Sequence, residues 1–374
     1  MKSIASSRAR ALAIGLLAAG LSLSAHAAHA AVALEVSADG KTAYRTIHEA
    51  IAALPPTGGV VHVHSGVYRE KIRIDKPHVL LIGLGKDASK VVITNDDYAA
   101  KYNPATRRNF GTSDSYTVMV TGNDFYATNL TIANTADYEP PNYLGNGQAL
   151  ALYSKGDRAV YRAVRLLSGQ DTLRIDGARR AYFHNSYVEG TVDYIWGDGK
   201  AVFDHCLVRT RINGRVDGTT TITAQGRERP DEDTGFVFID SDLLFESAKM
   251  SNVFLGRPWQ QYAATYFVNT TMGPQIAPAG WMEFHPGPGG SNNLPTSTYR
   301  EYNSLYPAAN GKWAASDLRQ RESVSPQSNV SLSANEAARL VADVYLAGND
   351  HWAPTRVNYG TKTQQKLPVP AAAP

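Results

Sequence analysis

Short apolar clusters recur along the chain, with polar residues between them. One run, AVYRAVRLL, begins at Ala159; AYFHNSYVEG begins at Ala181 and AVFDHCLVRT at Ala201, so the steps are 22 and 20 residues. Runs of this kind, split by Gly, Asn and Asp, are typical of short β-strands. A period of twenty-odd residues is typical of a solenoid in which each repeat forms one coil. The pattern therefore predicts an all-β chain wound as a parallel β-solenoid.

Helical spacing is found near the two ends of this β-rich region. Tyr44 to Leu54 carries such spacing and is expected to cap the N-terminal coil, because a bare strand edge favours aggregation. Ser333 to Glu336 matches a capping box, which predicts a helix through about Leu346. Four stretches are expected to be loops that project from one face and wall a cleft: 101–115, 136–147, 212–234 and 285–298.

The N-terminus resembles a secretion signal. Lys2, Arg8 and Arg10 precede the apolar run 11–22, and two A-x-A cleavage candidates end at Ala27 and Ala30. We therefore expect a signal peptide over 1–30, one domain over 31–362, and a disordered Pro/Ala-rich tail over 363–374. The expected location is outside the cell (secreted) or in a periplasm.

Charge and cysteine content narrow the class of partner. The signal holds three of the 37 basic residues and none of the 34 acidic ones, so the mature chain has 34 of each and a net charge near zero. Nothing suggests nucleic acid or an anionic membrane as partner, and we expect a monomer. The lone Cys206 excludes an internal disulfide and is expected to be a buried apolar filler. The ten histidines show no metal-ligand spacing, so neither a metal nor a cofactor is expected.

Four polar residues recur at the solenoid period. Gln148 and Gln170 are 22 residues apart, and so are Asp171 and Asp193. Equivalent positions in neighbouring coils stack at about 4.8 Å, so these side chains are expected to form one column on one face. Close carboxylates beside amide donors suit acid/base or nucleophilic chemistry.

The segment LGRPW at 255–259 adds a further candidate. By itself it is compatible with a simple turn, since Gly and Pro flank the arginine. Beside the column, however, Arg257 would keep a carboxylate ionised. Trp259 would offer a flat apolar face on which a sugar ring can stack.

Seven segments together resemble the signature segments of pectin methylesterases (carbohydrate esterase family 8), of the bacterial secreted type. The resemblance implies a right-handed single-stranded parallel β-helix with a short N-terminal capping helix and a C-terminal helical segment. It also implies removal of methyl esters from the galacturonate units of homogalacturonan (pectin). The segments are SGVYREKIRI (65–74), GQALALY (147–153), GQDTL (169–173), DYIWG (193–197), TAQG (223–226), LGRPW (255–259) and REYNS (300–304).

The resemblance also implies a role for each matching residue. Asp193 would be the nucleophile that forms a covalent acyl-enzyme, and Asp171 the acid/base. Gln170 would stabilise the oxyanion, and Gln148 would assist it or bind substrate. No metal or cofactor would be needed. The expected substrate-binding residues are Thr112, Gln148, Trp196, Arg257 and Trp259.

Two segments depart from the family pattern. DYIWG has Tyr194 and Trp196 where the family usually has two Phe, which predicts an altered subsite shape with catalysis retained. REYNSLYPAAN at 300–310 lacks the glycines that the family has there, which puts only a peripheral turn in doubt.

Four alternatives stay open. A retaining glycoside hydrolase on the same scaffold would also use carboxylates about 5 Å apart, although Gln donors favour an oxyanion over an oxocarbenium ion. A non-catalytic polysaccharide-binding relative should have lost an Asp or the Arg, and all are present. A pectate lyase would use calcium and acidic clusters that the sequence lacks. An esterase with a substrate other than pectin remains compatible with every motif.

Overall fold

Parallel strands dominate the part of the chain that can be described. The predicted signal peptide (1–30), the predicted tail (363–374) and parts of two predicted loops lie outside that part. No helix within it is long and apolar enough to cross a bilayer. The computed structural model describes residues 32–136, 147–212, 219–307, 312–315, 318–322, 330–357 and 359.

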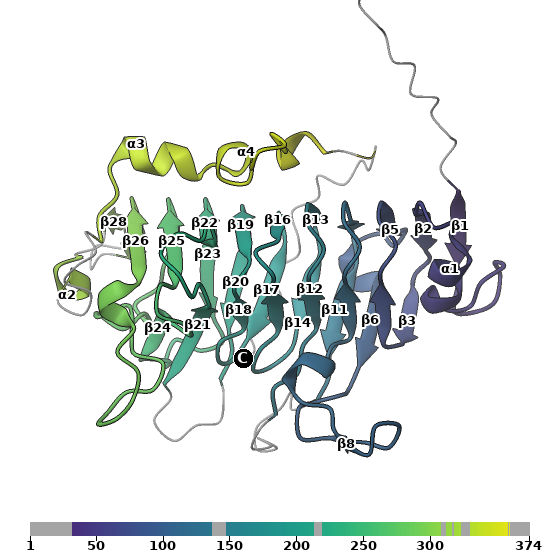
Figure 1. The fold of residues 1–374 in the computed structure, drawn as a ribbon, viewed down its shortest axis with the longest axis horizontal. Coiled ribbons are helices and arrows are strands. Elements are labelled where there is room, and N and C mark those ends of the chain that lie inside the picture. Colours follow the sequence, from purple (N-terminus) through teal and green to yellow (C-terminus); the bar gives the residue numbers. More distant parts are fainter. Residues whose placement is uncertain are drawn as a thin grey trace, which may run out of the picture. The chain divides into compact units, whose positions relative to one another are not determined.

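Three parallel sheets run the length of the coil and form a parallel β-helix (Figure 1). The ten-stranded sheet 1 consists of β1 (Ala33–Val36), β2 (Gly59–Val63), β5 (Val79–Gly83), β10 (Tyr126–Thr128), β13 (Ala159–Arg162), β16 (Arg180–His184), β19 (Lys200–Asp204), β22 (Gly235–Ile239), β25 (Ala264–Val268) and β26 (Thr298–Tyr302).

Sheets 2 and 3 have seven strands each. Sheet 2 consists of β3 (Gly66–Arg69), β6 (Val91–Asn95), β11 (Thr131–Asn134), β14 (Arg165–Leu167), β17 (Tyr187–Gly190), β20 (Leu207–Thr210) and β23 (Asp242–Phe245). Sheet 3 consists of β4 (Ile72–Ile74), β9 (Val118–Val120), β12 (Leu152–Ser154), β15 (Leu173–Ile175), β18 (Ile195–Gly197), β21 (Thr220–Gln225) and β24 (Val253–Gly256).

Smaller elements complete the described part. Two antiparallel hairpins pair β7 (Tyr102–Asn103) with β8 (Arg108–Asn109) and β27 (Leu305–Pro307) with β28 (Trp313–Ala315). The α-helices are α1 (Ile47–Ala53), α2 (Arg319–Glu322), α3 (Ala334–Ala337) and α4 (Ala342–Tyr345). The 3₁₀ turns are η1 (Ala88–Lys90), η2 (Thr112–Asp114), η3 (Leu294–Thr296), η4 (Ala338–Leu340) and η5 (Pro354–Arg356).

The repeat predicted from the apolar clusters is the repeat of the coil. Ala159 pairs with Ala181 and Ala181 with Ala201, so the three predicted runs stack in register. The prediction of a parallel solenoid is therefore confirmed, and each step of 20 or 22 residues is one coil.

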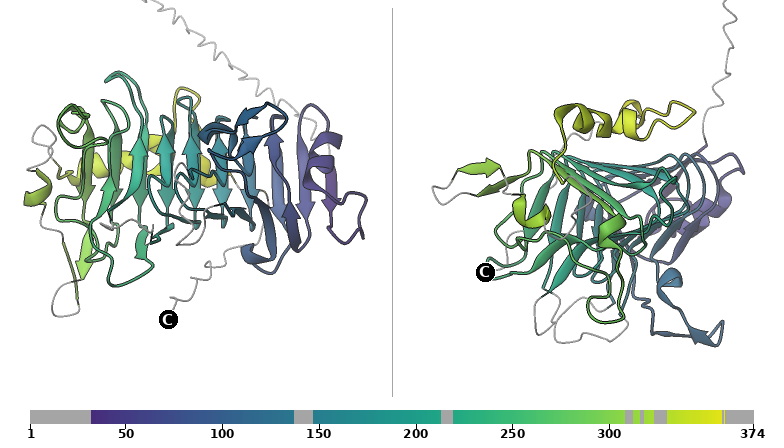
Figure 2. Two further views of the ribbon diagram at one scale, coloured as in Figure 1. Left: turned by 90° about the horizontal axis from the view of Figure 1, so that it is seen from below. Right: turned by 60° about the vertical axis from the view of Figure 1, so that its left-hand side comes forward.

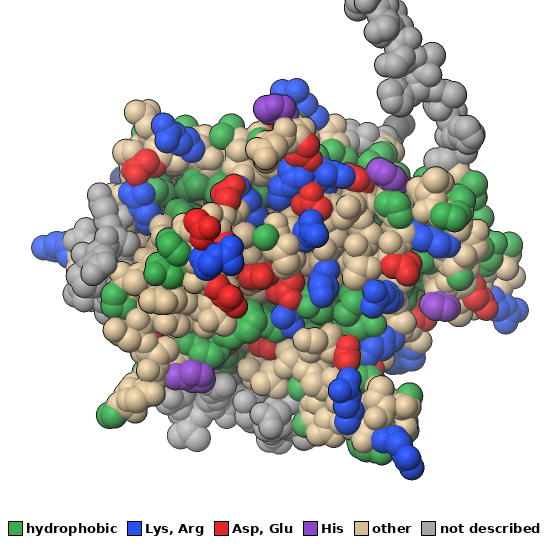
Figure 3. Space-filling model, viewed as in Figure 1, with side chains coloured by type: hydrophobic (Ala, Val, Ile, Leu, Met, Phe, Trp, Pro, Cys, Tyr) green, Lys and Arg blue, Asp and Glu red, His purple; other side chains and the backbone are tan. Residues whose placement is uncertain are grey.

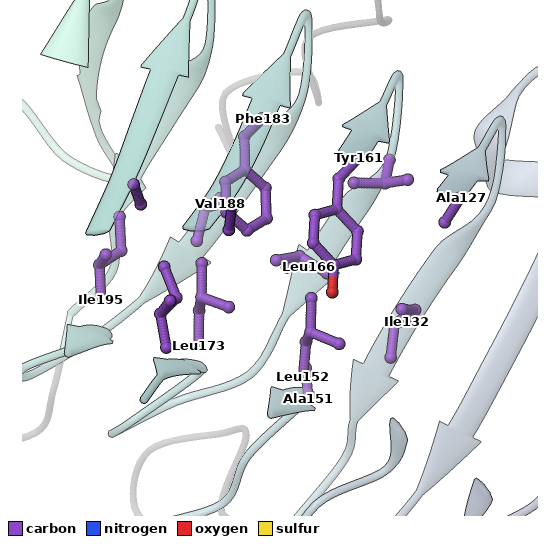
Figure 4. Packing of buried hydrophobic residues seen from close by; sticks show 14 of the residues in the cluster. Ala127, Ile132, Ala151, Leu152, Tyr161, Leu166, Leu173, Phe183, Val188 and Ile195 are labelled. Carbon is purple, nitrogen blue, oxygen red and sulfur yellow. The ribbon is translucent and has the colours of Figure 1, made fainter. Parts of the chain in front are cut away.

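Stacked aromatic rings fill the interior behind sheet 1. Tyr161, Phe183, Phe203, Phe238 and Phe267 occupy register-paired positions in successive coils, with ring centroids 4.6–4.7 Å apart and nearly parallel. Aliphatic side chains from sheets 2 and 3 point at these rings (Figure 4). This spacing is that of the strands, so parallel pairing itself brings the rings into stacking contact. The predicted burial of Cys206 in this core is confirmed.

The corner from sheet 1 to sheet 2 is the most regular turn of the coil. Two residues separate the strands there in every coil from β10 to β23. The first of the two is left-handed, with φ from 47° to 56°, a conformation that Asn and Asp tolerate better than most residues. Its backbone N–H donates to the next coil, as from Asn185 to the carbonyl of Asp204. The corner residues are Asn129, Ala163, Asn185, His205 and Asp240, and Asn269 and Asn303 continue the series.

Helices cover the N-terminal end and one face of the coil. The predicted capping helix exists as α1, but it begins at Ile47, because Thr46 is its N-cap and forms a capping box with Glu49. At the other end, the capping box of Ser333 and Glu336 is present. The continuous helix expected there is wrong, since Val341 has an extended backbone between η4 and α4.

The broken helix packs on sheet 1. Leu332, Leu340 and Leu346 lie against outward-facing residues of that sheet, such as Tyr182 and Val202. The two further views show this segment alongside the coil (Figure 2). A second correction concerns the predicted loop 212–234, because it contains β21, which is buried throughout and pairs with β18 and β24.

Candidate active site

Both predicted carboxylates stand where sheet 2 turns into sheet 3. Asp171 and Asp193 have positive φ values of 68° and 49°, and each precedes a strand of sheet 3 by two residues. The backbone N–H of Asp171 donates to the carbonyl of Val192 at 3.1 Å, and that of Asp193 donates to the carbonyl of Thr221 at 2.8 Å. The two residues therefore occupy the same corner in consecutive coils, as their spacing of 22 predicts.

A pocket of about 550 Å³ opens over this corner. Every residue that the sequence singled out for catalysis or substrate binding lines it, and five others join them. The lining residues are Thr112, Ser113, Gln148, Gln170, Asp171, Arg174, Asp193, Trp196, Ala224, Arg257, Trp259, Phe284 and His285.

Asp193 is held from two sides. The guanidinium of Arg257 donates from Nε to Oδ1 at 2.9 Å and from Nη2 to Oδ2 at 2.6 Å, a two-pronged contact that fixes the plane of the carboxylate. The hydroxyl of Thr221 donates to Oδ1 at 2.6 Å. Arg257 is itself fixed by Phe284, whose carbonyl accepts from Nη1 at 2.9 Å and whose ring lies 4.4 Å from the guanidinium carbon.

Asp171 lies in a contrasting environment. Burial raises the pKa of the Asp171 carboxyl well above its usual range, and the negative charge of Asp193 adds to this shift. The charges of Arg257 and Arg174 oppose it without cancelling it. The pair thus consists of one carboxylate with a bound cation and one carboxyl that favours its protonated form. Neighbouring carboxyls whose environments differ in this way are suited to different roles in one reaction.

The two glutamines bring amide groups to the same corner. The backbone N–H of Ala149 donates to the carbonyl of Gln170 at 3.1 Å, so Gln148 and Gln170 belong to adjacent coils. The side-chain oxygen of Gln148 is buried and has no hydrogen-bond partner among the described residues. Gln170 precedes Asp171 in the chain and lines the same pocket. Two carboxamides therefore stand beside two carboxylates, as the predicted column requires.

Aromatic side chains form one wall of the pocket. The rings of Trp196 and Trp259 meet edge to face, with centroids 5.2 Å apart and planes at 75°. A Cβ on Gly226 would lie 2.6 Å from Cε3 of Trp259, so this position has to be glycine for the indole to sit where it does. Of the two departures in DYIWG, only Trp196 lines the pocket, because Tyr194 is buried in the core with its hydroxyl against Thr210.

The amino-acid sequence is similar to a known protein family over most of its length. Residues 33–348 match the pectinesterase family profile. The chain belongs to the pectinesterase family. Pectinesterase 2 of Citrus sinensis is 33% identical over 328 residues, with 85% of this chain and 58% of that protein covered. Pectinesterase 2 of Olea europaea is 31% identical over 320 residues, with 84% and 81% covered.

Several relatives are much longer than this family member. It covers 46% of one pectinesterase/pectinesterase inhibitor of Arabidopsis thaliana and 58% of another. The chain thus spans about half the length of these curated relatives.

Solved structures of the family have the same fold. A pectin methylesterase in complex with a hexasaccharide superposes with a TM-score of 0.71 at 27% identity, with 86% of this chain and 98% of that chain covered. The pectin methylesterase of Erwinia chrysanthemi gives 0.70 at 28% identity, with the same coverage. The carrot enzyme gives 0.69 at 28%, with 85% and 93% covered.

Arg174 is the most prominent pocket residue of this family member that sequence reasoning missed. It is register-paired with Tyr153 and Trp196, and its guanidinium carbon lies 4.3 Å from the Trp196 ring. Nη2 forms an ion pair with Asp176 at 2.6 Å, and Nη1 donates to the hydroxyl of Ser113 at 2.7 Å. The sequence could have predicted its position. Leu173 points into the core, and because successive side chains of a strand point to opposite faces, Arg174 has to point outward.

Phe284 was also missed, and so were Ser113, Ala224 and His285. Phe284 comes from a segment without regular structure, 27 residues after Arg257. No period in the sequence connects the two, so only the folded chain shows that they touch.

Proposed function

We propose that this member of the pectinesterase family removes methyl esters from galacturonate units of pectin and releases methanol. The observation that carries the proposal is the unequal pair of carboxyls in one pocket. Asp193 is bound two-pronged by Arg257, and burial raises the pKa of Asp171. Amide donors stand beside the pair, and the half-buried indole of Trp259, which packs against Trp196, offers a surface on which a sugar ring can stack.

In the proposed first step, Asp193 attacks the carbonyl carbon of the methyl ester. The carbonyl oxygen becomes negative and accepts hydrogen bonds from the amides of Gln170 and Gln148, each worth about 3 kcal/mol by analogy with other oxyanion holes. Asp171 donates its proton to the departing methoxide, and methanol leaves. The product is an anhydride between the galacturonate carboxyl and Asp193.

In the second step, Asp171 is ionised and acts as the base. It takes a proton from a water molecule, which attacks the galacturonoyl carbon of the anhydride. The carboxylate of Asp193 departs, and Asp171 is protonated again. Galacturonic acid, now unesterified, remains in the polymer, and the two side chains have returned to their starting states. These steps use only groups of this chain, the ester and water.

Methanol release from highly methylated pectin, measured together with reducing ends, tests this function. We expect methanol without new reducing ends, because the ester and not the glycosidic bond is broken. New reducing ends in proportion to added enzyme would instead favour the glycoside hydrolase. Release from simple methyl esters but not from pectin would favour an esterase for another substrate.

Two variants of the nucleophile test the mechanism. Asp193→Ala should abolish methanol release, but it leaves Arg257 buried without its partner, which costs about 3–5 kcal/mol of stability. Asp193→Asn keeps the shape and one acceptor, so it separates loss of chemistry from loss of fold. More than a few per cent of activity in either variant, with a native circular-dichroism spectrum, would contradict the role of Asp193.

We also propose that residues 1–30 direct secretion, on the basis of the basic start and apolar run in the sequence. Mass spectrometry of the protein recovered from medium and periplasm would give both the location and the mature N-terminus.

Charges of both signs are interspersed on the face in Figure 3, which agrees with the near-zero net charge of the mature chain.

A further inference from the structure

Outside the pocket, three side chains that can ligate metals meet at the corner between sheets 1 and 2. His184 ends β16 and Asp204 ends β19, and these two residues are register partners in neighbouring coils. His205 follows at the left-handed corner position, with a φ of 53°. One ligand atom from each residue lies within 4.8 Å of the other two. None of the three lines the catalytic pocket.

The three side chains converge on one carboxylate. Nδ1 of His184 lies 3.4 Å from Oδ2 of Asp204, and Nδ1 of His205 contacts the other oxygen, Oδ1. The imidazole centroids are 5.8 Å apart and the ring planes are inclined at 59°, so the rings are not simply stacked. Zinc–nitrogen and zinc–oxygen bonds of about 2.0–2.2 Å at tetrahedral angles put two ligand atoms roughly 3.3–3.5 Å apart. The separation between His184 and Asp204 falls in that range, whereas the direct contact between His205 and Asp204 is closer and has to lengthen when an ion binds.

A buried tyrosine orients the carboxylate. Tyr182 is 1% exposed, and its hydroxyl donates to Oδ2 of Asp204 at 2.5 Å. Hydrogen bonds of this kind fix the ligating groups of metal sites and commonly change affinity about 10- to 100-fold.

One acidic and one basic side chain lie in the coils on either side of these three residues. Asp240 occupies the same corner in the following coil, about one strand spacing away. Arg162 is the register partner of His184 in the preceding coil. Its Nη2 donates to the carbonyls of Pro354 and Thr355 at 3.1 Å each, so the guanidinium is engaged by the C-terminal segment.

We propose that His184, Asp204 and His205 bind a divalent transition-metal ion of the zinc class. Two imidazoles and one carboxylate suit Zn²⁺, Ni²⁺ or Cu²⁺, whereas Mg²⁺ and Ca²⁺ prefer all-oxygen sites. His205 is 60% exposed, so the ion has a route in and water can occupy the remaining position. The ion would link two coils and stabilise the folded chain by mass action. It would take no part in ester hydrolysis.

Titration of the full chain, without a histidine tag and stripped of metal, tests the site. Isothermal calorimetry with ZnCl₂ should give one ion per chain, and MgCl₂ should give no heat of binding. Zinc should also raise the midpoint of thermal unfolding. Cobalt should give the visible absorption bands of a nitrogen- and oxygen-ligated ion.

Variants can be chosen that respect the fold. His205→Asn places at the corner a residue that other coils already have there, as at Asn185 and Asn269. This variant and His184→Gln should lose zinc binding. Tyr182→Phe should weaken it about tenfold or more. His48→Ala removes a histidine of α1 and should bind as the wild type does.

Two results would overturn the proposal. One is the absence of stoichiometric zinc binding by the wild-type chain. The other is unchanged zinc affinity in folded His205→Asn and His184→Gln, which would place the ion elsewhere.

Discussion

Replacement of Arg257 by lysine tests whether the shape of the cation, beyond its charge, serves catalysis. The shortest charged hydrogen bonds from the guanidinium to the two oxygens of Asp193 are 2.9 and 2.6 Å long, and Nη1 also donates to the Phe284 carbonyl at 2.9 Å. A lysine ammonium can keep one contact with the carboxylate, but it cannot hold both oxygens in one plane.

The expected loss follows from these contacts. One charged hydrogen bond is worth about 1.5–3 kcal/mol, and the bond to the carbonyl adds about 0.5–1.5 kcal/mol. If the sum of about 2–4.5 kcal/mol is lost in the transition state, kcat falls about 30- to 2000-fold. We expect KM to change far less, because the pair orients the nucleophile and leaves the indole wall intact.

The assay is methanol release over a range of pectin concentrations, with circular dichroism as the check on folding. Arg158→Lys is the matched control, since Arg158 binds Asp124 through Nε and Nη2 at 2.7 Å each and does not line the pocket. A folded Arg257→Lys enzyme with a kcat within a few-fold of wild type would show that charge alone suffices.

Three further outcomes are expected. The pKa of Asp171 is raised in the folded state, so the native chain keeps a proton that the unfolded chain releases, and the contribution of this carboxyl to stability falls as pH rises above about 4; the stability of Asp171→Asn relative to wild type should therefore grow as pH rises through that range in denaturant melts, and a constant difference would contradict the shift. Gly226→Ala should displace Trp259 and raise KM with little change in the unfolding midpoint; an unchanged KM would mean that the indole does not contact substrate. Methanol release by a chain that circular dichroism shows to be folded should survive excess EDTA, because no step of the proposed hydrolysis uses a metal; loss of activity in the folded chain that added zinc or calcium restores would overturn that mechanism.

Much of the fold follows from spacing alone. In a parallel coil the period in sequence is the stacking period in space, so a step of 22 residues is enough to assign Asp171 and Asp193 to adjacent coils. The capping box of Ser333 is equally readable, because it depends on residues three apart.

The features that escaped prediction depend on contacts between segments of irregular length. Strand β21 follows a long connection after β20, so the spacing of 20 to 22 residues between coils does not predict where it begins. The helix after Ser333 breaks at Val341, and a capping box at the start of a helix does not predict where the helix ends. His184 and His205 show no ligand spacing along the chain, and only the stacking of coils brings them together.

The two-residue corner between sheets 1 and 2 has a consequence for how such chains can change. From β11 to β24, the connections from sheet 2 to sheet 3 contain from 4 to 17 residues, while that corner keeps its length in every coil. Insertions are therefore tolerated at the corner between sheets 2 and 3, which carries the pocket. The corner between sheets 1 and 2 keeps a constant length over these coils. A designer could exchange whole loops around Asp171 and Asp193 to alter the polysaccharide accepted. A residue inserted after Arg162 or His184 would instead have to loop out of the corner, as the longer connection from β5 to β6 does while both strands keep their pairing with the next coil.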